Sequence, residues 1–158
     1  MKLLSKILLI TSAVIGIAII NISVLAYFNE LRQADATTVE LANKQIFFLQ
    51  KMREHSLLVA GGEFENRKKV LEFVDLYQTS SDLLNGGGFV NGSKVNSVAH
   101  LSPDLNEKNL NKWKEYKQNV LVVAEEKVFN LNVLDARDYV VQNSDILFSK
   151  VEKASNRL

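Results

Sequence analysis

The chain has 158 residues, of which 47% are hydrophobic and 23% charged, and its formal net charge is +1. Such a balanced charge argues against a nucleic-acid-binding surface, which needs a basic patch. The absence of cysteine excludes disulfides and c-type haem attachment, and a single proline predicts long helices with few breaks.

The first predicted element is a membrane-spanning helix. The 22 residues from Ile7 to Phe28 carry no charge, and about 20 apolar residues in a helix cross a bilayer. Lys2 and Lys6 precede this run, which favours a cytoplasmic N-terminus. We therefore expect residues 1–28 to be cytoplasmic lysines plus a transmembrane anchor. Residues 29–158 then form one extracytoplasmic domain.

A cleaved signal peptide is the alternative for the same segment. Val24-Leu25-Ala26 offers a small-residue cleavage site. The apolar run is longer than the roughly 7–15 residues of a usual signal peptide, which favours a retained anchor. Both interpretations export the remainder of the chain.

The next predicted helix continues from Phe28 to about Ala60 and ends at Gly61-Gly62. Its apolar residues form two stripes. This pattern suits either a helix that packs on two sides, as in a bundle that also dimerises, or one wide stripe facing the core. The first stripe contains Val39, Ala42, Ile46, Leu49 and Ala60, and the second Leu41, Phe48, Met52 and Val59.

Four further segments follow. A helix is predicted over 64–85, a loop with a turn at Asn91-Gly92 over 89–102, and helices over 103–129 and 132–158. The predicted inward residues are Val70, Phe73, Val74, Tyr77, Leu83 and Leu84, then Leu105, Trp113, Tyr116, Val120 and Val123, and finally Val133, Ala136, Val140, Leu147, Val151, Ala154 and Leu158. The predicted fold class is all-α: an N-terminal transmembrane helix followed by an up-down antiparallel four-helix bundle.

No residue pattern supports catalysis or a bound cofactor. The two histidines, His55 and His100, lack an acidic residue three positions earlier, so the Glu-x-x-His pairs of a di-iron bundle are missing. His55 is expected to be a surface or interhelical polar residue. We predict no enzyme activity, no metal and no cofactor.

Polar residues interleave with apolar ones in the helix that follows the anchor. Amides and cations in this setting can line a pocket for a small polar or anionic ligand between helices, or can simply form a solvated face. The candidate ligand-binding residues are Asn43, Gln45, Gln50, Lys51 and Arg53.

The segment Ala42 to Met52 (ANKQIFFLQKM) resembles the Ala-Gly-Arg-Gln-Arg-Met-Leu-Ser-Gln-Arg-Met motif. This motif opens the N-terminal sensor domain of type IV pili methyl-accepting chemotaxis transducers and of nitrate/nitrite sensor kinases. Residues 73–87, Trp113 to Val120 and 143–158 are similar to later helices of that family.

The resemblance implies a periplasmic four-helix bundle, usually a homodimer, anchored in the bacterial inner membrane. Such a domain senses a ligand and signals through a second membrane helix to a kinase or chemotaxis output. Ile46 stands where the nitrate sensors carry their anion-binding arginine, while Gln45, Gln50 and Lys51 keep the character of the motif. The 158 residues include neither a second membrane helix nor an output module.

We therefore expect a single-pass, membrane-anchored sensor domain of a signal-transduction receptor, which lacks its own output module and acts with a signalling partner protein. The alternative is a membrane-anchored helical adaptor of the cell envelope that binds another protein and no small molecule.

Overall fold

A computed structural model describes residues 2–99, 103–126 and 130–155, and over these ranges the protein is almost entirely helical. The predicted all-α class is confirmed, with one small β-hairpin added. In chain order the elements are α1 (Lys2–Ala60), the 3-10 helix η1 (Phe64–Asn66), α2 (Arg67–Gly86), β1 (Gly88–Val90), β2 (Ser93–Val95), α3 (Pro103–Glu125) and α4 (Leu131–Ser155).

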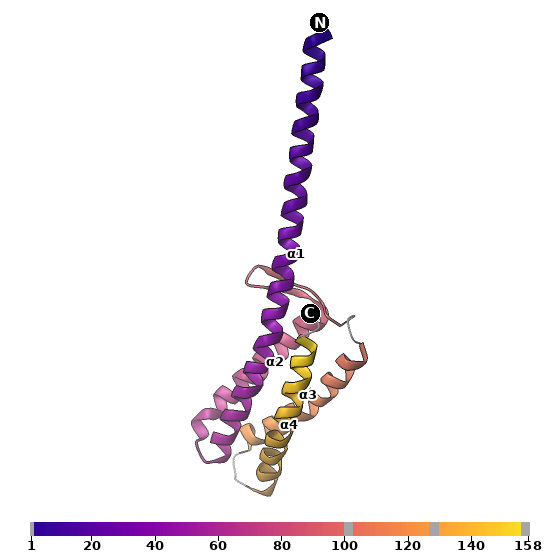
Figure 1. The fold of residues 1–158 in the computed structure, drawn as a ribbon. Coiled ribbons are helices and arrows are strands. Elements are labelled where there is room, and N and C mark those ends of the chain that lie inside the picture. The colour runs from indigo at the N-terminus through magenta and orange to yellow at the C-terminus, as the bar shows by residue number, and fades with distance from the viewer. Residues whose placement is uncertain (1, 100–102, 127–129, 156–158) are drawn as a thin grey trace.

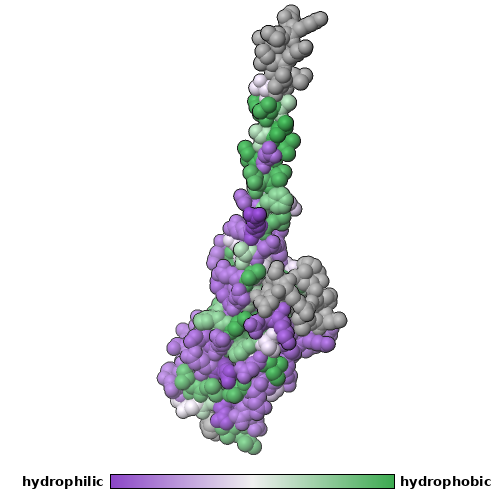
Figure 2. All heavy atoms as spheres, viewed as in Figure 1, coloured by the Kyte–Doolittle hydropathy of each residue, from purple (hydrophilic) through white to green (hydrophobic). Residues whose placement is uncertain are grey.

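The longest element, α1, has two different halves. Its 59 residues extend over about 88 Å, and the N-terminal half projects alone from the folded part (Figure 1). On the face seen in Figure 2, the coloured part of this projecting half is mostly hydrophobic, whereas the folded part is mostly hydrophilic. Within the described ranges, α1 is the one helix long and apolar enough to cross a membrane.

The end of α1 falls at Ala60, as the two glycines predict. The amide of Gly61 donates to the Leu57 carbonyl at 2.9 Å, and the amide of Glu63 donates to the Leu58 carbonyl at 2.9 Å. Gly62 between them has a φ of 102°, a conformation that glycine adopts with little strain. The turn therefore closes the helix and directs the chain into η1.

The main core is shared by the C-terminal half of α1 and the three later helices. Both predicted stripes of α1 contribute to it or to a smaller cluster under the hairpin. Within one chain both stripes thus face the core or this cluster, while packing of α1 against a second copy stays a prediction. Buried core residues include Leu49, Met52 and Val59 of α1, Val70, Val74 and Tyr77 of α2, Trp113, Tyr116 and Val120 of α3, and Ala136, Val140 and Leu147 of α4. Among the other predicted inward residues, Leu84, Val123, Val133 and Val151 are buried and Phe73 and Leu83 are half-buried.

Part of the predicted 89–102 loop is a β-hairpin, so that prediction was wrong in this part. Gly88 pairs with Val95, Phe89 with Lys94, and Val90 with Ser93. The predicted turn at Asn91-Gly92 is confirmed, because φ is positive at both residues (50° and 82°), as a two-residue hairpin turn requires. Strands of three residues are too short to leave an alternating sequence pattern.

The remaining helix ends differ slightly from the prediction. The first turn predicted from Phe64 is the separate 3-10 helix η1, and α4 begins one residue early, where the Asn130 side chain accepts the Val133 amide at 3.1 Å. α3 ends at Glu125, before the predicted end at about Phe129, and residues 127–129 lie outside the described residues. The side chains of Leu105, Ala154 and Leu158 are also outside them.

The packing of α1 predicts that substitution of a buried leucine destabilises the fold more than substitution of an exposed one. Leu49 is 0% exposed and Leu57 is 39% exposed on the same helix. We expect Leu49→Ala to lower the free energy of unfolding by about 2–5 kcal/mol, because it leaves a cavity in the core. The matched variant Leu57→Ala should cost less than about 1 kcal/mol. Urea unfolding of the full chain in detergent, followed by circular dichroism, measures both, and equal losses would contradict this core.

Candidate functional site

The five predicted ligand-binding residues all lie on the C-terminal half of α1, but they do not converge on one pocket. Successive residues of a helix turn by about 100°, so these positions point in several directions. Asn43 and Gln50 are exposed on one face, Gln45 is buried, and Lys51 and Arg53 are half-buried. Asn43 and Gln50 flank the exposed Phe47, and the Lys51 ammonium also lies 6.0 Å from the centre of the Phe47 ring.

The two cations among them hold acidic partners. The Arg53 guanidinium donates to Asp145 of α4 at 3.1 Å, which links α1 to α4. The Lys51 ammonium lies 2.6 Å from Glu54, one turn away, and this hydrogen bond lowers the pKa of the Glu54 carboxyl. Arg53 therefore acts in the structure as a tie between helices, whereas Lys51 pairs within its own helix.

A small open cleft lies nearer to the apolar half of α1, between that helix and the hairpin. It has a volume of about 120 Å³ and none of the five candidates lines it. Lys44 and Glu40 form an ion pair of 2.6 Å at its edge. The cleft is well below the roughly 300–1,000 Å³ of a drug-sized site, so only a very small polar molecule fits. Its lining residues are Thr37, Glu40, Leu41, Lys44, Val90, Asn91 and Ser93.

Polar contacts hold the hairpin region to α1 beside this cleft. The backbone amide of Asn96 donates to the Thr38 hydroxyl at 2.9 Å, and the Asn96 side chain donates to Asp35 at 2.9 Å. Gln33 reaches Ser93 at 3.4 Å. Thr38 in turn donates to the Ala34 carbonyl at 2.7 Å, so its hydroxyl is saturated and buried. The three contacts between α1 and residues 93–96 join positions about 60 residues apart, so no local sequence pattern predicts them.

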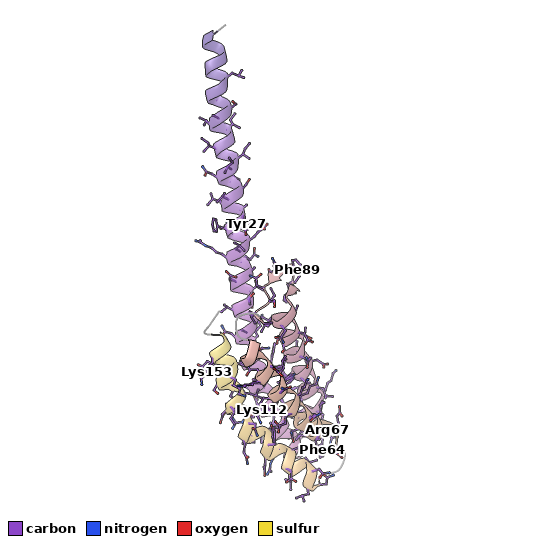
Figure 3. The ribbon with its side chains drawn as sticks, turned by 90° about the vertical axis from the view of Figure 1, so that its right-hand side faces the viewer. Tyr27, Phe64, Arg67, Phe89, Lys112 and Lys153 are labelled. Atoms are coloured by element: carbon purple, nitrogen blue, oxygen red, sulfur yellow. The ribbon has the colours of Figure 1, made fainter. Side chains whose placement is uncertain are left out.

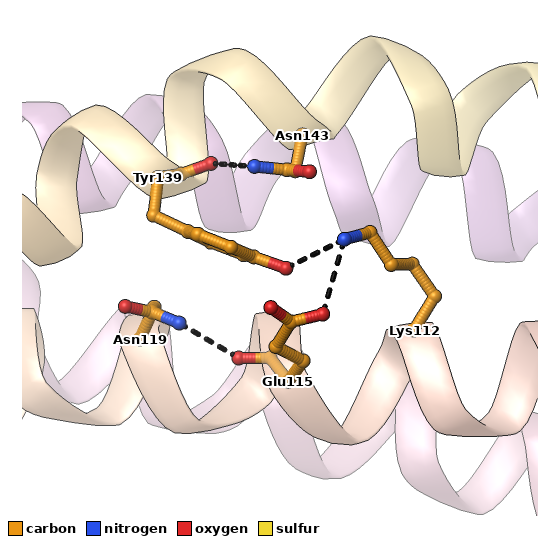
Figure 4. A network of polar contacts seen from close by, with 5 residues as sticks. All are labelled: Lys112, Glu115, Asn119, Tyr139 and Asn143. Atoms are coloured by element: carbon orange, nitrogen blue, oxygen red, sulfur yellow. Dashed lines mark hydrogen bonds and ion pairs between the residues drawn. The ribbon is translucent and has the colours of Figure 1, made fainter.

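A polar network links α3 to α4 on the outside of the folded part (Figure 4). The Lys112 ammonium donates to the Tyr139 hydroxyl at 2.8 Å and to Glu115 at 3.0 Å. Hydrogen bonds from the Tyr139 hydroxyl and the Lys112 ammonium lower the pKa of Glu115, and hydrogen bonds to Tyr139 and Glu115 raise the pKa of Lys112. Both shifts stabilise the charged forms, so neither Glu115 nor Lys112 changes protonation near neutral pH. The hydrogen bond from Lys112 to Tyr139 ties α3 to α4.

Two polar contacts lie deeper, between helices. The Ser144 hydroxyl donates to the Val140 carbonyl, so Tyr116, 3.2 Å away, is the donor to Ser144. Burial raises the pKa of Tyr116 to about 12. His55 is buried and stacks on Phe73 of α2 at 5.7 Å, with its Nδ1 3.0 Å from the Asn66 side-chain oxygen. His55 is thus an interhelical polar residue, one of its two predicted settings, while His100 lies outside the described residues.

The described parts of the chain bring no three metal-ligating side chains together. A comparison with protein-family models, with characterised proteins and with solved structures finds no match to this chain. The functional interpretation therefore rests on the residues and contacts described above.

The hairpin attachment predicts a contrast between two neighbouring threonines. Thr37 and Thr38 both donate to a carbonyl four residues earlier, but only Thr38 also accepts the Asn96 amide. We expect Thr38→Val to cost about 1–3 kcal/mol, because it leaves that amide without its acceptor. Hydrogen exchange at Asn96 should speed up markedly in Thr38→Val and stay unchanged in Thr37→Val. Unchanged exchange in both variants would show that the hairpin is held by other contacts.

The buried Tyr116 predicts a loss of stability in alkali. The pKa of Tyr116 is about 12 in the folded chain, whereas in the unfolded chain it returns to the ordinary tyrosine pKa of 10.0. The stability linked to this proton is complete below pH 10 and is lost as the pH rises toward 12. At about pH 11 the loss should be about 1.4 kcal/mol.

The control for this prediction is Tyr116→Phe, which removes the titrating group and conserves the ring. Near neutral pH the variant should be less stable by about 0.5–1.5 kcal/mol, because it lacks the hydrogen bond to Ser144. Between pH 10 and pH 11 it should lose less stability than the unsubstituted chain. Urea unfolding curves across this range measure the difference, and parallel losses would assign the alkaline transition to other groups.

Proposed function

We propose that this chain is the extracytoplasmic input domain of a bacterial signal-transduction receptor of the chemotaxis-transducer or sensor-kinase type. In this proposal α1 crosses the inner membrane once, and the remainder forms an up-down antiparallel four-helix bundle in the periplasm. The bundle acts as a homodimer, has no enzymatic activity, and acts with a signalling partner protein. Its resemblance to such sensor domains in the Ala42 to Met52 segment supports the proposal.

The observation that carries the proposal is the continuity of α1. One helix without a break joins the exposed apolar half to the core residues Leu49, Met52 and Val59. When the helix shifts in the core, the apolar half therefore moves with it, because no flexible linker separates the two. Shifts of packed helices by a turn or less are a known switching mode.

The contact between α1 and α4 is the place where such a shift would act. The ion pair from Arg53 to Asp145 bridges these two helices near the solvent, and both side chains keep some exposure. An exposed ion pair contributes only about 0–1 kcal/mol, so it can be remade in a shifted register at little cost. The apolar core beneath it, with Leu49 and Leu147, resists larger movements.

The ligand would bind to the outer strip of α1, which we define as Asn43, Phe47 and Gln50. These three residues are exposed at spacings of four and three, so they lie along one face of the helix. Two amides beside an aromatic ring suit a small polar or anionic ligand held against a second copy of the chain. Gln45, Lys51 and Arg53 belong in this proposal to the support of that face.

A ligand screen tests the proposal. We expect one class among small anions, amino acids and dicarboxylates to raise the thermal midpoint of the full chain in detergent. The shift should grow with ligand concentration by mass action. At 100 times the dissociation constant, the ligand should raise the free energy of unfolding by about 2.7 kcal/mol. The double variant Asn43→Ala with Gln50→Ala should abolish the shift.

The matched control is Gln142→Ala, which removes an exposed amide from α4 and should leave the ligand shift intact. A screen without any stabilising compound, together with a stable protein partner recovered by crosslinking, would contradict the sensor proposal. That outcome would identify the chain as an envelope adaptor.

A further inference from the structure

The two faces of the hairpin differ in what they contact. The register places Val90, Ser93 and Val95 on one face, and this face packs toward Leu41 and Ala42 of α1. The cross-strand partners Phe89 and Lys94 lie on the opposite face, which we call the outer hairpin face. Phe89 is 72% exposed there, which is unusual for a phenylalanine with a packed hairpin beneath it.

The outer hairpin face lies close to the apolar half of α1. Ser93 contacts Gln33, which is five residues beyond Phe28, the last residue of the uncharged run. Five residues correspond to about 7–8 Å along the helix, and each headgroup layer of a bilayer is about 5–8 Å thick. In Figure 3, Phe89 lies at the end of the folded part that is nearest to Tyr27.

Tyr27 and Phe28 mark the level at which the apolar half ends. Both rings are exposed and touch edge to face at 6.1 Å. Aromatic residues at the end of an apolar helix gather at the boundary between acyl chains and headgroups. The hairpin is therefore within reach of the headgroup layer that surrounds α1.

We propose that the outer hairpin face, Phe89 and Lys94, rests in the headgroup layer of the membrane that α1 crosses. This inference depends on the proposed membrane anchoring of α1. An aromatic ring and an ammonium side by side suit a phospholipid surface, because the ring enters the boundary with the acyl chains while the cation meets lipid phosphates. Exposed Arg32, next to Gln33, adds a second cation near this level.

Because the hairpin is attached to α1, a contact between the hairpin and the membrane also constrains the position of α1. Thr38 and Asp35 fix the hairpin region to α1 through Asn96, and the Asn91-Gly92 turn fixes the two strands to each other. The hairpin therefore cannot retreat from the membrane without leaving α1. Contact on one side of the helix sets both the depth and the tilt of α1.

The absence of cysteine allows a direct test with single thiol labels. The variants Leu25→Cys, Phe89→Cys and Leu131→Cys carry the same fluorescent label in nanodiscs of phosphatidylethanolamine and phosphatidylglycerol. Leu131, at the start of α4, is the matched control because it is 71% exposed, almost the same as Phe89. Lipids with a quencher near the headgroup should quench the label at position 89 several-fold more than the label at position 131.

Charge provides the second arm of the test. Adding Lys94→Glu to the Phe89→Cys variant should reduce the quenching in these anionic nanodiscs, whereas Lys68→Glu, a change of an exposed lysine near the start of α2, should not. Equal quenching at positions 89 and 131, with strong quenching at position 25 by a deep quencher, would overturn the inference and leave the anchor intact. Weak quenching at position 25 would overturn the anchor and the inference together.

Discussion

The wide buried face of α1 is the constraint on which the folded part depends. α2, α3, α4, η1 and β2 all pack against α1, whose buried residues lie between Ala34 and Ala60. Leu49 and Met52 are fully buried near the middle of this segment. The later helices meet on this face of α1, and α3 and α4 also pack extensively against each other. The same helix also carries the exposed apolar half, so the core and the membrane-spanning candidate are parts of one rigid element.

Polar contacts close the two ends of the folded part. At the end near the apolar half, Thr38 accepts the Asn96 amide, which attaches the hairpin region to α1. At the far end, Arg67 donates to the Glu126 carbonyl at the end of α3 and lies 4.5 Å from the Phe64 ring. These side chains supply partners to backbone groups that the helices and strands leave unpaired. The apolar core thus sets which faces meet, while the polar ends set how far the helices can slide.

Much of the fold could be predicted, because the decisive signals are local. Gly61-Gly62 ends α1, Pro103 begins α3, and the spacing of Tyr116, Val120 and Val123 shows which face of α3 is buried. The hairpin was missed because three-residue strands lack periodicity. The candidate site was harder to predict. The sequence shows that Arg53 and Gln50 lie on one helix, but not that Arg53 pairs with Asp145 while Gln50 is exposed. The ion pair depends on the position of α4, because Asp145 lies 92 residues away in the chain.

The unbroken course of α1 has one more consequence, which concerns rotation. A continuous helix has a fixed phase, so the bundle and the apolar half face directions set by the number of residues between them. Each residue added near Leu31 would turn one part against the other by about 100° and separate them by about 1.5 Å. Seven added residues, close to two full turns, would nearly restore the original direction. The orientation of the folded part relative to the apolar half is therefore encoded in the length of the connecting helix, independently of the contacts within the core.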